Sequence, residues 1–181
     1  MKLLAFATFA VSIGLVAAVP VDEAAAADGA PEFFLIRHAE KNHDGTISAK
    51  GMKRAECLIN VFGKNSKYNI QHIMVQTPHS NSNLSQRPYN TTLPLANSLG
   101  IKMDTPCNYN DPKCAANFAL KYRGGNVLIG WEHGYLYEVS KALGGKNVKK
   151  YPGDHYDLIY NQPSPYTSVT VTSEDCPGLD S

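Results

Sequence analysis

The sequence predicts an α/β protein: a three-layer α/β/α sandwich with a mostly parallel central sheet. One observation behind this prediction is that short apolar runs of strand length alternate with amphipathic stretches of helix length. Another is that the main apolar runs are continuous, which is typical of parallel strands buried on both faces. Such an alternation gives a sheet covered by helices on both sides. A chain of 181 residues is long enough for one domain with a single core.

The first half of the chain contains two predicted strand–helix units. Residues 33–36 (FFLI) form the first strand, and a helix follows from its cap at Ser48 to about residue 62. The second strand is predicted over residues 70–76. Pro88 suits the first turn of the next helix, which Gly100 ends.

The second half continues the alternation. Residues 113–122 are predicted to be helical, residues 126–131 form a buried strand, and residues 135–143 form another helix. Two further strands are expected near residues 157–160 and 166–172. The last of these alternates between apolar and polar side chains, as an edge strand does.

The N-terminus has the layout of a secretory signal peptide. Lys2 precedes an apolar run that ends in small residues at position 18, and this run is too short and poorly flanked for a confident membrane span. We therefore expect a signal peptide over residues 1–18, a flexible leader over residues 19–30 and one domain over residues 31–181. The alternative is a retained N-terminal anchor. The first interpretation predicts a secreted, extracellular protein that has no membrane association after cleavage.

The four cysteines agree with export, because disulfide bonds require an even number. Four cysteines allow three pairings. A short loop with a turn at residues 110–112 separates Cys107 from Cys114, which suggests one bridge between them. That pairing would leave Cys57 to bond Cys176 and tie the C-terminal tail to the first helix. A zinc site is not favoured, because the sequence has no C-x-x-C pair.

Charge composition argues against nucleic acid as the main partner. The formal net charge is +1, and no block of lysine and arginine stands out. Nucleic-acid-binding proteins usually carry a clustered basic face. The oligomeric state is not indicated by the sequence.

Two predicted strands end in the same way, with a histidine beside a charged residue. Arg37 and His38 follow the first strand, and Glu132 and His133 follow the strand over residues 126–131. Ligands of open parallel sheets bind beyond the carboxyl ends of the strands, so these side chains are expected to converge.

Arg87 directly precedes Pro88, at the predicted start of the next helix, and its side chain is expected to enter the same crevice. The planar guanidinium group matches phosphate oxygens in a bidentate manner, and a helix N-terminus adds N–H donors. The residues therefore predict a compact, cationic phosphate pocket.

Four segments in order resemble the histidine phosphatase (phosphoglycerate mutase-like) superfamily, most closely its small secreted fungal members. Residues 34–40 (FLIRHAE) resemble its R-H-G-E strand-end motif, with Ala39 in place of glycine. Residues 48–58 (SAKGMKRAECL) resemble the L-S-x-x-G-x-x-R-A-x-x-L helix. Residues 85–91 (SQRPYNT) resemble the S-x-R-x-x-x-T segment, and residues 127–134 (VLIGWEHG) resemble the strand that delivers a second histidine.

The resemblance implies a phosphomonoester hydrolase that forms a phosphohistidine on His38. Arg37, Arg87 and His133 would bind the phosphoryl oxygens, and His133 would also act in catalysis. No metal and no organic cofactor are implied. The expected substrate is a small-molecule phosphate ester or an exposed phosphate group. Mutase activity is less expected, because phosphoglycerates are cytosolic and this chain has the features of an exported protein.

The general acid is the open position in this scheme. Relatives supply a carboxylate, either after the second arginine or directly after the second histidine, where this chain has Gly134. Glu132, Asp104 and Asp111 remain, and Glu132 is the first choice. The alternative role for Glu132 is that of a structural hydrogen-bond partner.

The alternative function is a non-catalytic secreted binding or host-interaction protein on the same scaffold. The substitution at Ala39 and the missing acid favour it, and the intact set of two arginines and two histidines favours an enzyme.

Overall fold

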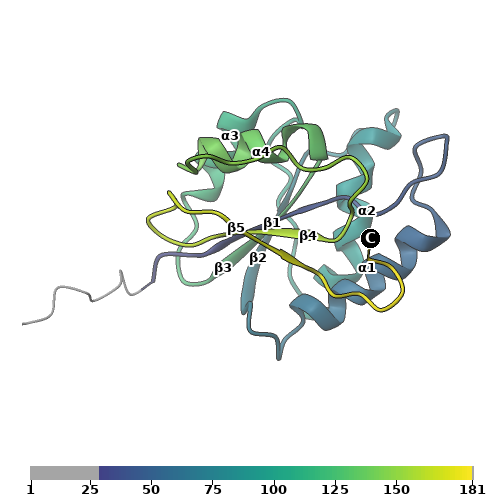
Figure 1. Ribbon diagram of the computed structural model, residues 1–181, viewed down its shortest axis with the longest axis horizontal. Helices are drawn as coiled ribbons and strands as arrows, with labels where there is room; N and C mark the ends of the chain where they lie inside the picture. The colour runs from purple at the N-terminus through teal and green to yellow at the C-terminus, as the bar shows by residue number, and fades with distance from the viewer. Residues whose placement is uncertain (1–28, 181) are drawn as a thin grey trace, which may run out of the picture.

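The computed structural model describes residues 29–180, in which a five-stranded sheet lies between two pairs of helices (Figure 1). The elements follow one another as β1 (Phe33–Arg37), α1 (Ala49–Phe62), β2 (Ile70–Val75), α2 (Asn83–Leu99), α3 (Pro112–Ala119), β3 (Asn126–Trp131), α4 (His133–Ala142), β4 (Leu158–Gln162) and β5 (Thr170–Ser173). The predicted signal peptide and leader residues 19–28 lie outside the described residues. Among residues 29–180, none of the helices has the length and apolar character that a membrane crossing requires.

The strand order is β2-β3-β1-β4-β5. Strands β2, β3 and β1 run parallel, whereas β4 pairs antiparallel with β1 and β5 antiparallel with β4. Arg37 is in register with Trp131 across β1 and β3, so these strands end side by side. The residues that follow them leave the sheet at one edge, as expected for the ligand-binding edge of a parallel sheet.

The two faces of the sheet are covered separately, which confirms the three-layer α/β/α prediction. Phe33 and Leu35 of β1 pack in the core that contains residues of α3 and α4. Phe34 and Ile36 point the other way and pack with residues of α1 and α2. Successive strand side chains alternate between faces, so a continuous apolar run such as residues 33–36 serves both cores.

Helix α2 starts before the predicted start at Pro88, which lies inside the helix. Ser82 is its N-cap and accepts a hydrogen bond from the backbone N–H of Ser85. Pro88 has no N–H and so leaves the carbonyl of Leu84 without its helical donor. The Gln76 side-chain amide donates to the carbonyls of Leu84 and Ser85, at 3.2 Å each. This replacement donor explains why proline is tolerated inside α2.

Both predicted disulfide bonds are present. Cys107 joins Cys114 with a Cα separation of 5.8 Å, and Cys57 joins Cys176 with a Cα separation of 6.1 Å. The second bond links α1 to the chain after β5. The segment around Cys176 consequently lies beside α1, although the two are far apart in sequence (Figure 1).

Candidate active site

The structure brings the predicted site residues together at the edge where β1 and β3 end. The imidazole ring of His38 lies 5.9 Å, centroid to centroid, from that of His133, the first residue of α4. Arg87 lies in the second turn of α2, and Arg37 is the last residue of β1. Thr91 joins α2 to β1, because its Oγ1 accepts from the Ala39 N–H at 2.9 Å and donates to the Arg87 carbonyl.

His38 has a defined tautomer. Its Nδ1 atom lies 2.7 Å from the carbonyl oxygen of Ala39, and a carbonyl can only accept, so Nδ1 carries the proton. The lone pair is then on Nε2. That atom is buried and has no hydrogen-bond partner among residues 29–180. A neutral imidazole with a free Nε2 lone pair is the nucleophilic form.

The surroundings keep this imidazole neutral. Burial comes first and lowers the pKa of His38, and the positive charges of Arg87 and Arg37 lower it further, to about 3. The hydrogen bond to Ala39 opposes these effects but is outweighed.

We expect the neutral form of His38 to persist well below the usual histidine pKa of 6.5. Because the depressed pKa belongs to the folded state, acid should destabilise the fold as pH falls from 6.5 toward 3. An NMR titration of the His38 ring measures its pKa directly, without any substrate whose own ionisation would interfere. A titration midpoint near 6.5 would contradict the burial of Nε2.

Arg37 is held by the loop before β4. Its Nη1 donates to the carbonyls of Gly153, at 2.9 Å, and His155. The face of its guanidinium lies over Tyr156, with 3.8 Å between Cζ and the ring centroid. Such cation–π stacking fixes the plane of the guanidinium group.

Two arginine nitrogens near His38 favour the binding of an anion. The Nε atoms of Arg37 and Arg87 are buried and have no hydrogen-bond partner among residues 29–180. Buried polar groups are normally paired, so an unpaired set in one place indicates a ligand-binding site. Desolvation lowers the pKa of both guanidinium groups, but Arg remains charged at physiological pH. The ligand that this site binds is therefore expected to be an anion.

Glu132 is the N-cap of α4, and this explains why the helix begins at His133 rather than at the predicted residue 135. Its Oε2 accepts from the N–H of Gly134 at 2.8 Å. Its Oε1 lies 2.8 Å from Nδ1 of His133. Burial alone would raise the pKa of Glu132, but His133 and the Gly134 N–H outweigh it and lower the pKa. An ionised carboxylate with both oxygens engaged favours the structural role for Glu132 over the role of proton donor.

The two other candidate acids are engaged in separate contacts. Asp104 accepts a hydrogen bond from the hydroxyl of Tyr122. Asp111 caps α3 by accepting from the N–H of Cys114 at 3.0 Å. Their carboxylates therefore serve local structure.

Glu132→Gln tests the role of this carboxylate. If Glu132 only holds His133, turnover of an alkyl phosphate and of nitrophenyl phosphate should fall by similar factors, roughly 10- to 100-fold. A proton donor matters mainly for the basic alkoxide leaving group, and its loss would slow the alkyl ester alone by roughly 10²–10⁴. Steady-state rates on the two substrates separate these roles. A selective loss on the alkyl ester would restore Glu132 as the acid.

Gln76 is a site-supporting residue that the sequence interpretation missed. It is fully buried, and its Oε1 accepts from the backbone N–H of Glu132 at 2.9 Å while its amide holds the first turns of α2. It thus connects the helix that carries Arg87 to the start of the helix that carries His133. The available signal was a polar residue directly after a buried strand, the same signal that identified Arg37 and His38.

Metal binding is a second chemical possibility for this cluster. His38, Glu132 and His133 each offer a ligand atom, and these atoms lie within 4.8 Å of one another. The charges of Arg37 and Arg87 act on the same side chains, since they lower the pKa of His38. Two positive charges oppose a further cation and favour an anion.

Comparison with known proteins identifies the fold. No protein-family model and no curated protein sequence matches this chain. A solved structure of the protein histidine phosphatase SixA complexed with tungstate superposes with a TM-score of 0.52 at 13% identity, covering 79% of this chain and 97% of that one. A protein from Agrobacterium tumefaciens, described as a candidate phosphohistidine phosphatase SixA, gives a TM-score of 0.46 at 15% identity, covering 82% of this chain and 99% of the other. This chain therefore has the fold of the histidine phosphatase SixA.

Proposed function

We propose that this protein is a secreted phosphomonoester hydrolase that forms a phosphohistidine on His38. The observation that carries the proposal is the buried, unprotonated Nε2 of His38 beside two buried Arg Nε atoms that have no partner among residues 29–180. An electron-rich nitrogen next to unpaired cationic donors suits an electrophilic phosphorus whose oxygens are negatively charged.

The reaction then has two steps. The Nε2 lone pair attacks phosphorus, the N–P bond forms, and the ester P–O bond breaks with its electron pair passing to the departing oxygen, which takes a proton from water. Arg37, Arg87 and His133 hold the phosphoryl oxygens and neutralise their charge in the transition state. The phosphorylated ring is cationic, and its Nδ1 proton continues to donate to the Ala39 carbonyl. Water then attacks phosphorus, the N–P bond breaks with its electron pair returning to Nε2, and the neutral ring is restored as inorganic phosphate leaves with the protons of the water.

The shared fold supports the choice of an oxyanion ligand. SixA was solved with tungstate, and tungstate is a tetrahedral oxyanion like phosphate. For this chain we propose a small-molecule phosphate ester or an exposed phosphate group as substrate.

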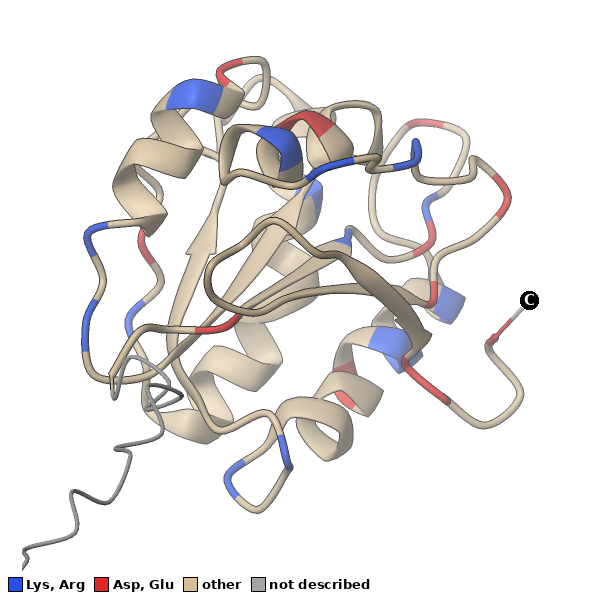
Figure 2. Ribbon diagram, turned by 60° about the vertical axis from the view of Figure 1, so that its left-hand side comes forward, with Lys and Arg blue, Asp and Glu red and all other residues tan. Residues whose placement is uncertain are grey.

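Secretion is part of the proposal. Two disulfide bonds in a chain of this size are typical of an oxidising compartment. Lysine and arginine are interspersed with aspartate and glutamate over many elements (Figure 2), unlike the clustered basic face used for nucleic acid. We therefore propose that the protein, after cleavage of its signal peptide, has neither nucleic acid nor a membrane as a partner.

A steady-state assay of the oxidised, purified protein with nitrophenyl phosphate tests the function. We expect turnover that inorganic phosphate and tungstate inhibit competitively. Calorimetric titration with inorganic phosphate provides the second readout. A protein that binds phosphate without turning over aryl or alkyl phosphates would instead be the non-catalytic binding protein.

A further inference from the structure

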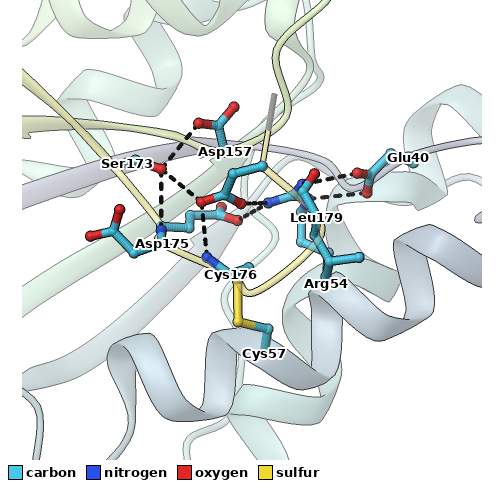
Figure 3. Close-up of a disulfide and its surroundings, with 10 residues drawn as sticks. Glu40, Arg54, Cys57, Asp157, Ser173, Asp175, Cys176 and Leu179 are labelled. Atoms are coloured by element: carbon cyan, nitrogen blue, oxygen red, sulfur yellow. Dashed lines mark hydrogen bonds and ion pairs between the residues drawn. A yellow bond between two sulfur atoms is a disulfide. The ribbon is translucent and has the colours of Figure 1, made fainter.

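Arg54 of α1 is a fully buried arginine at the centre of a polar cluster (Figure 3). The cluster lies between Glu40, in the segment that follows His38, and the C-terminal tail, residues 174–180. Its Nε and Nη2 donate to the two carboxylate oxygens of Glu40, at 3.0 and 2.9 Å. Its Nη1 donates to Glu174 at 2.7 Å and to Asp180 at 3.0 Å, and Nη2 also donates to the Leu179 carbonyl at 2.7 Å. Every nitrogen of the guanidinium group is thus engaged, and the pKa of Arg54 is raised, against desolvation, by Glu40 and Glu174.

Glu40 links this cluster to the nucleophile. It lies two residues after His38, and the intervening peptide supplies the carbonyl of Ala39 that fixes the His38 tautomer. The backbone carbonyl of Glu40 accepts from the Ser48 N–H at 2.9 Å and lies so close to α1 that a Cβ on Gly51 would meet it at 2.3 Å. The backbone and the side chain of Glu40 are therefore both held on α1.

The other side of Arg54 is the C-terminal tail, residues 174–180. The disulfide bond from Cys57 to Cys176 fastens this tail to α1, one turn after Arg54. The N–H of Cys176 donates to Asp180 at 2.9 Å, and Asp180 in turn accepts from Arg54. Glu174 is almost fully buried, and burial raises its pKa to about 8 although Arg54 opposes the shift. The tail residues that accept hydrogen bonds from Arg54 are therefore held covalently in two ways, by the main chain after β5 and by this disulfide bond.

A second path runs from the tail to Arg37. Ser173 is the last residue of β5, and its hydroxyl lies 3.1 Å from Asp157 and 2.9 Å from Asp180. Asp157 contacts Nδ1 of His155 at 3.1 Å, and the carbonyl of His155 accepts from Arg37. The tail is therefore connected by successive contacts to the phosphate-binding arginine as well.

We propose that Arg54 is a positioning residue, which together with the disulfide-fastened tail holds the Ala39–Glu40 peptide and thereby orients the His38 imidazole for attack. The expected loss of kcat rests on the proposed function, whereas the expected change in the His38 tautomer does not. Arginine is required because one planar group must bind Glu40 with two parallel bonds while it also binds the tail. A lysine in its place keeps the charge and cannot form both sets of bonds.

The first test compares Arg54→Lys and Glu40→Gln with a control, Lys50→Met. Lys50 also contacts Glu40, at 3.5 Å, but it is exposed and outside the bidentate pair. We expect both test variants to lower kcat by roughly 10- to 100-fold, the effect of a small displacement of a reacting group. KM and phosphate inhibition should change little, because Arg37 and Arg87 remain. The control should retain kcat within about twofold, since exposed ion pairs contribute little.

The decisive readout is the ring of His38 itself. Nitrogen-15 NMR of the imidazole distinguishes the Nδ1–H tautomer from the Nε2–H tautomer without any substrate. The folded wild-type protein should show the Nδ1–H form, and the two test variants a mixture. A wild-type protein with the fixed tautomer and no phosphatase activity would overturn the proposed function and leave the positioning role standing.

The second test addresses the tail without touching Arg54. Cys57→Ser/Cys176→Ser should reproduce the loss of kcat and the mixed tautomer at a temperature below its Tm. The matched control, Cys107→Ser/Cys114→Ser, removes the other bridge and should retain both properties. An unchanged His38 tautomer in the tail-disulfide variant, or in folded Arg54→Lys and Glu40→Gln, would overturn the inference.

Discussion

Replacing His38 with alanine is expected to abolish both the phosphoenzyme and turnover. In the proposed mechanism the His38 side chain supplies the attacking atom, and the imidazole of His133 belongs to a different element, α4. Nδ1 of His133 lies beside the carboxylate of Glu132, and the proposed role of His133 is to bind a phosphoryl oxygen. Loss of a covalent nucleophile can cost on the order of 10⁶-fold in kcat.

The phosphoenzyme is measured by rapid acid-free quenching after incubation with a labelled phosphomonoester. The label should be acid-labile and alkali-stable, as expected for a phosphoramidate and not for a phosphoserine. His79→Ala is the control, because His79 contacts Asn108 at 2.9 Å and has no place in the proposed mechanism. Labelling that survives in His38→Ala would assign the nucleophile to another residue.

The strand and helix pattern was predictable because most elements carry strong local signals. The strand over residues 126–131 and the helix capped by Ser48 agree with the structure, since burial on both faces and capping are properties of the local sequence. The start of α2 was not predictable from Pro88 alone. Gln76, which compensates for the proline, directly follows β2, and only the folded chain brings it to the Leu84 carbonyl.

The candidate site also has a part that the sequence predicted and a part that it did not. Arg37, His38 and His133 stand at strand ends, where sequence pattern and sheet topology together predict convergence. Glu40 and Arg54 lie in two of the matched segments, but the sequence does not show that their side chains contact each other near His38. Arg54 contacts Glu40, Glu174 and Asp180, which are separated from it by 14, 120 and 126 residues. The predicted disulfide bond between Cys57 and Cys176 is a sequence observation that pointed to the tail.

Arg87→Ala should weaken phosphate binding while the fold persists. Arg87 is only 7% exposed, and its Nε, which has no partner among residues 29–180, is available to bind an anion. A hydrogen bond to a charged group contributes about 1.5–3 kcal/mol, which corresponds to a loss of roughly 10- to 150-fold in affinity for inorganic phosphate. The loss in kcat/KM should be larger, because charge on the phosphoryl oxygens is neutralised most strongly in the transition state.

The same substitution has a second consequence at the nucleophile. Arg87 is one of the positive charges that lower the pKa of His38, so its removal should raise that pKa while burial keeps it below 6.5. Phosphate inhibition constants and an NMR titration of His38 measure the two effects on one protein. Arg123→Ala is the control, because this exposed arginine donates to the carbonyls of Leu120 and Tyr122 in the turn before β3. Unchanged phosphate inhibition together with an unchanged His38 pKa would place Arg87 outside the pocket, and the anion would then have to be held by Arg37 and His133 alone.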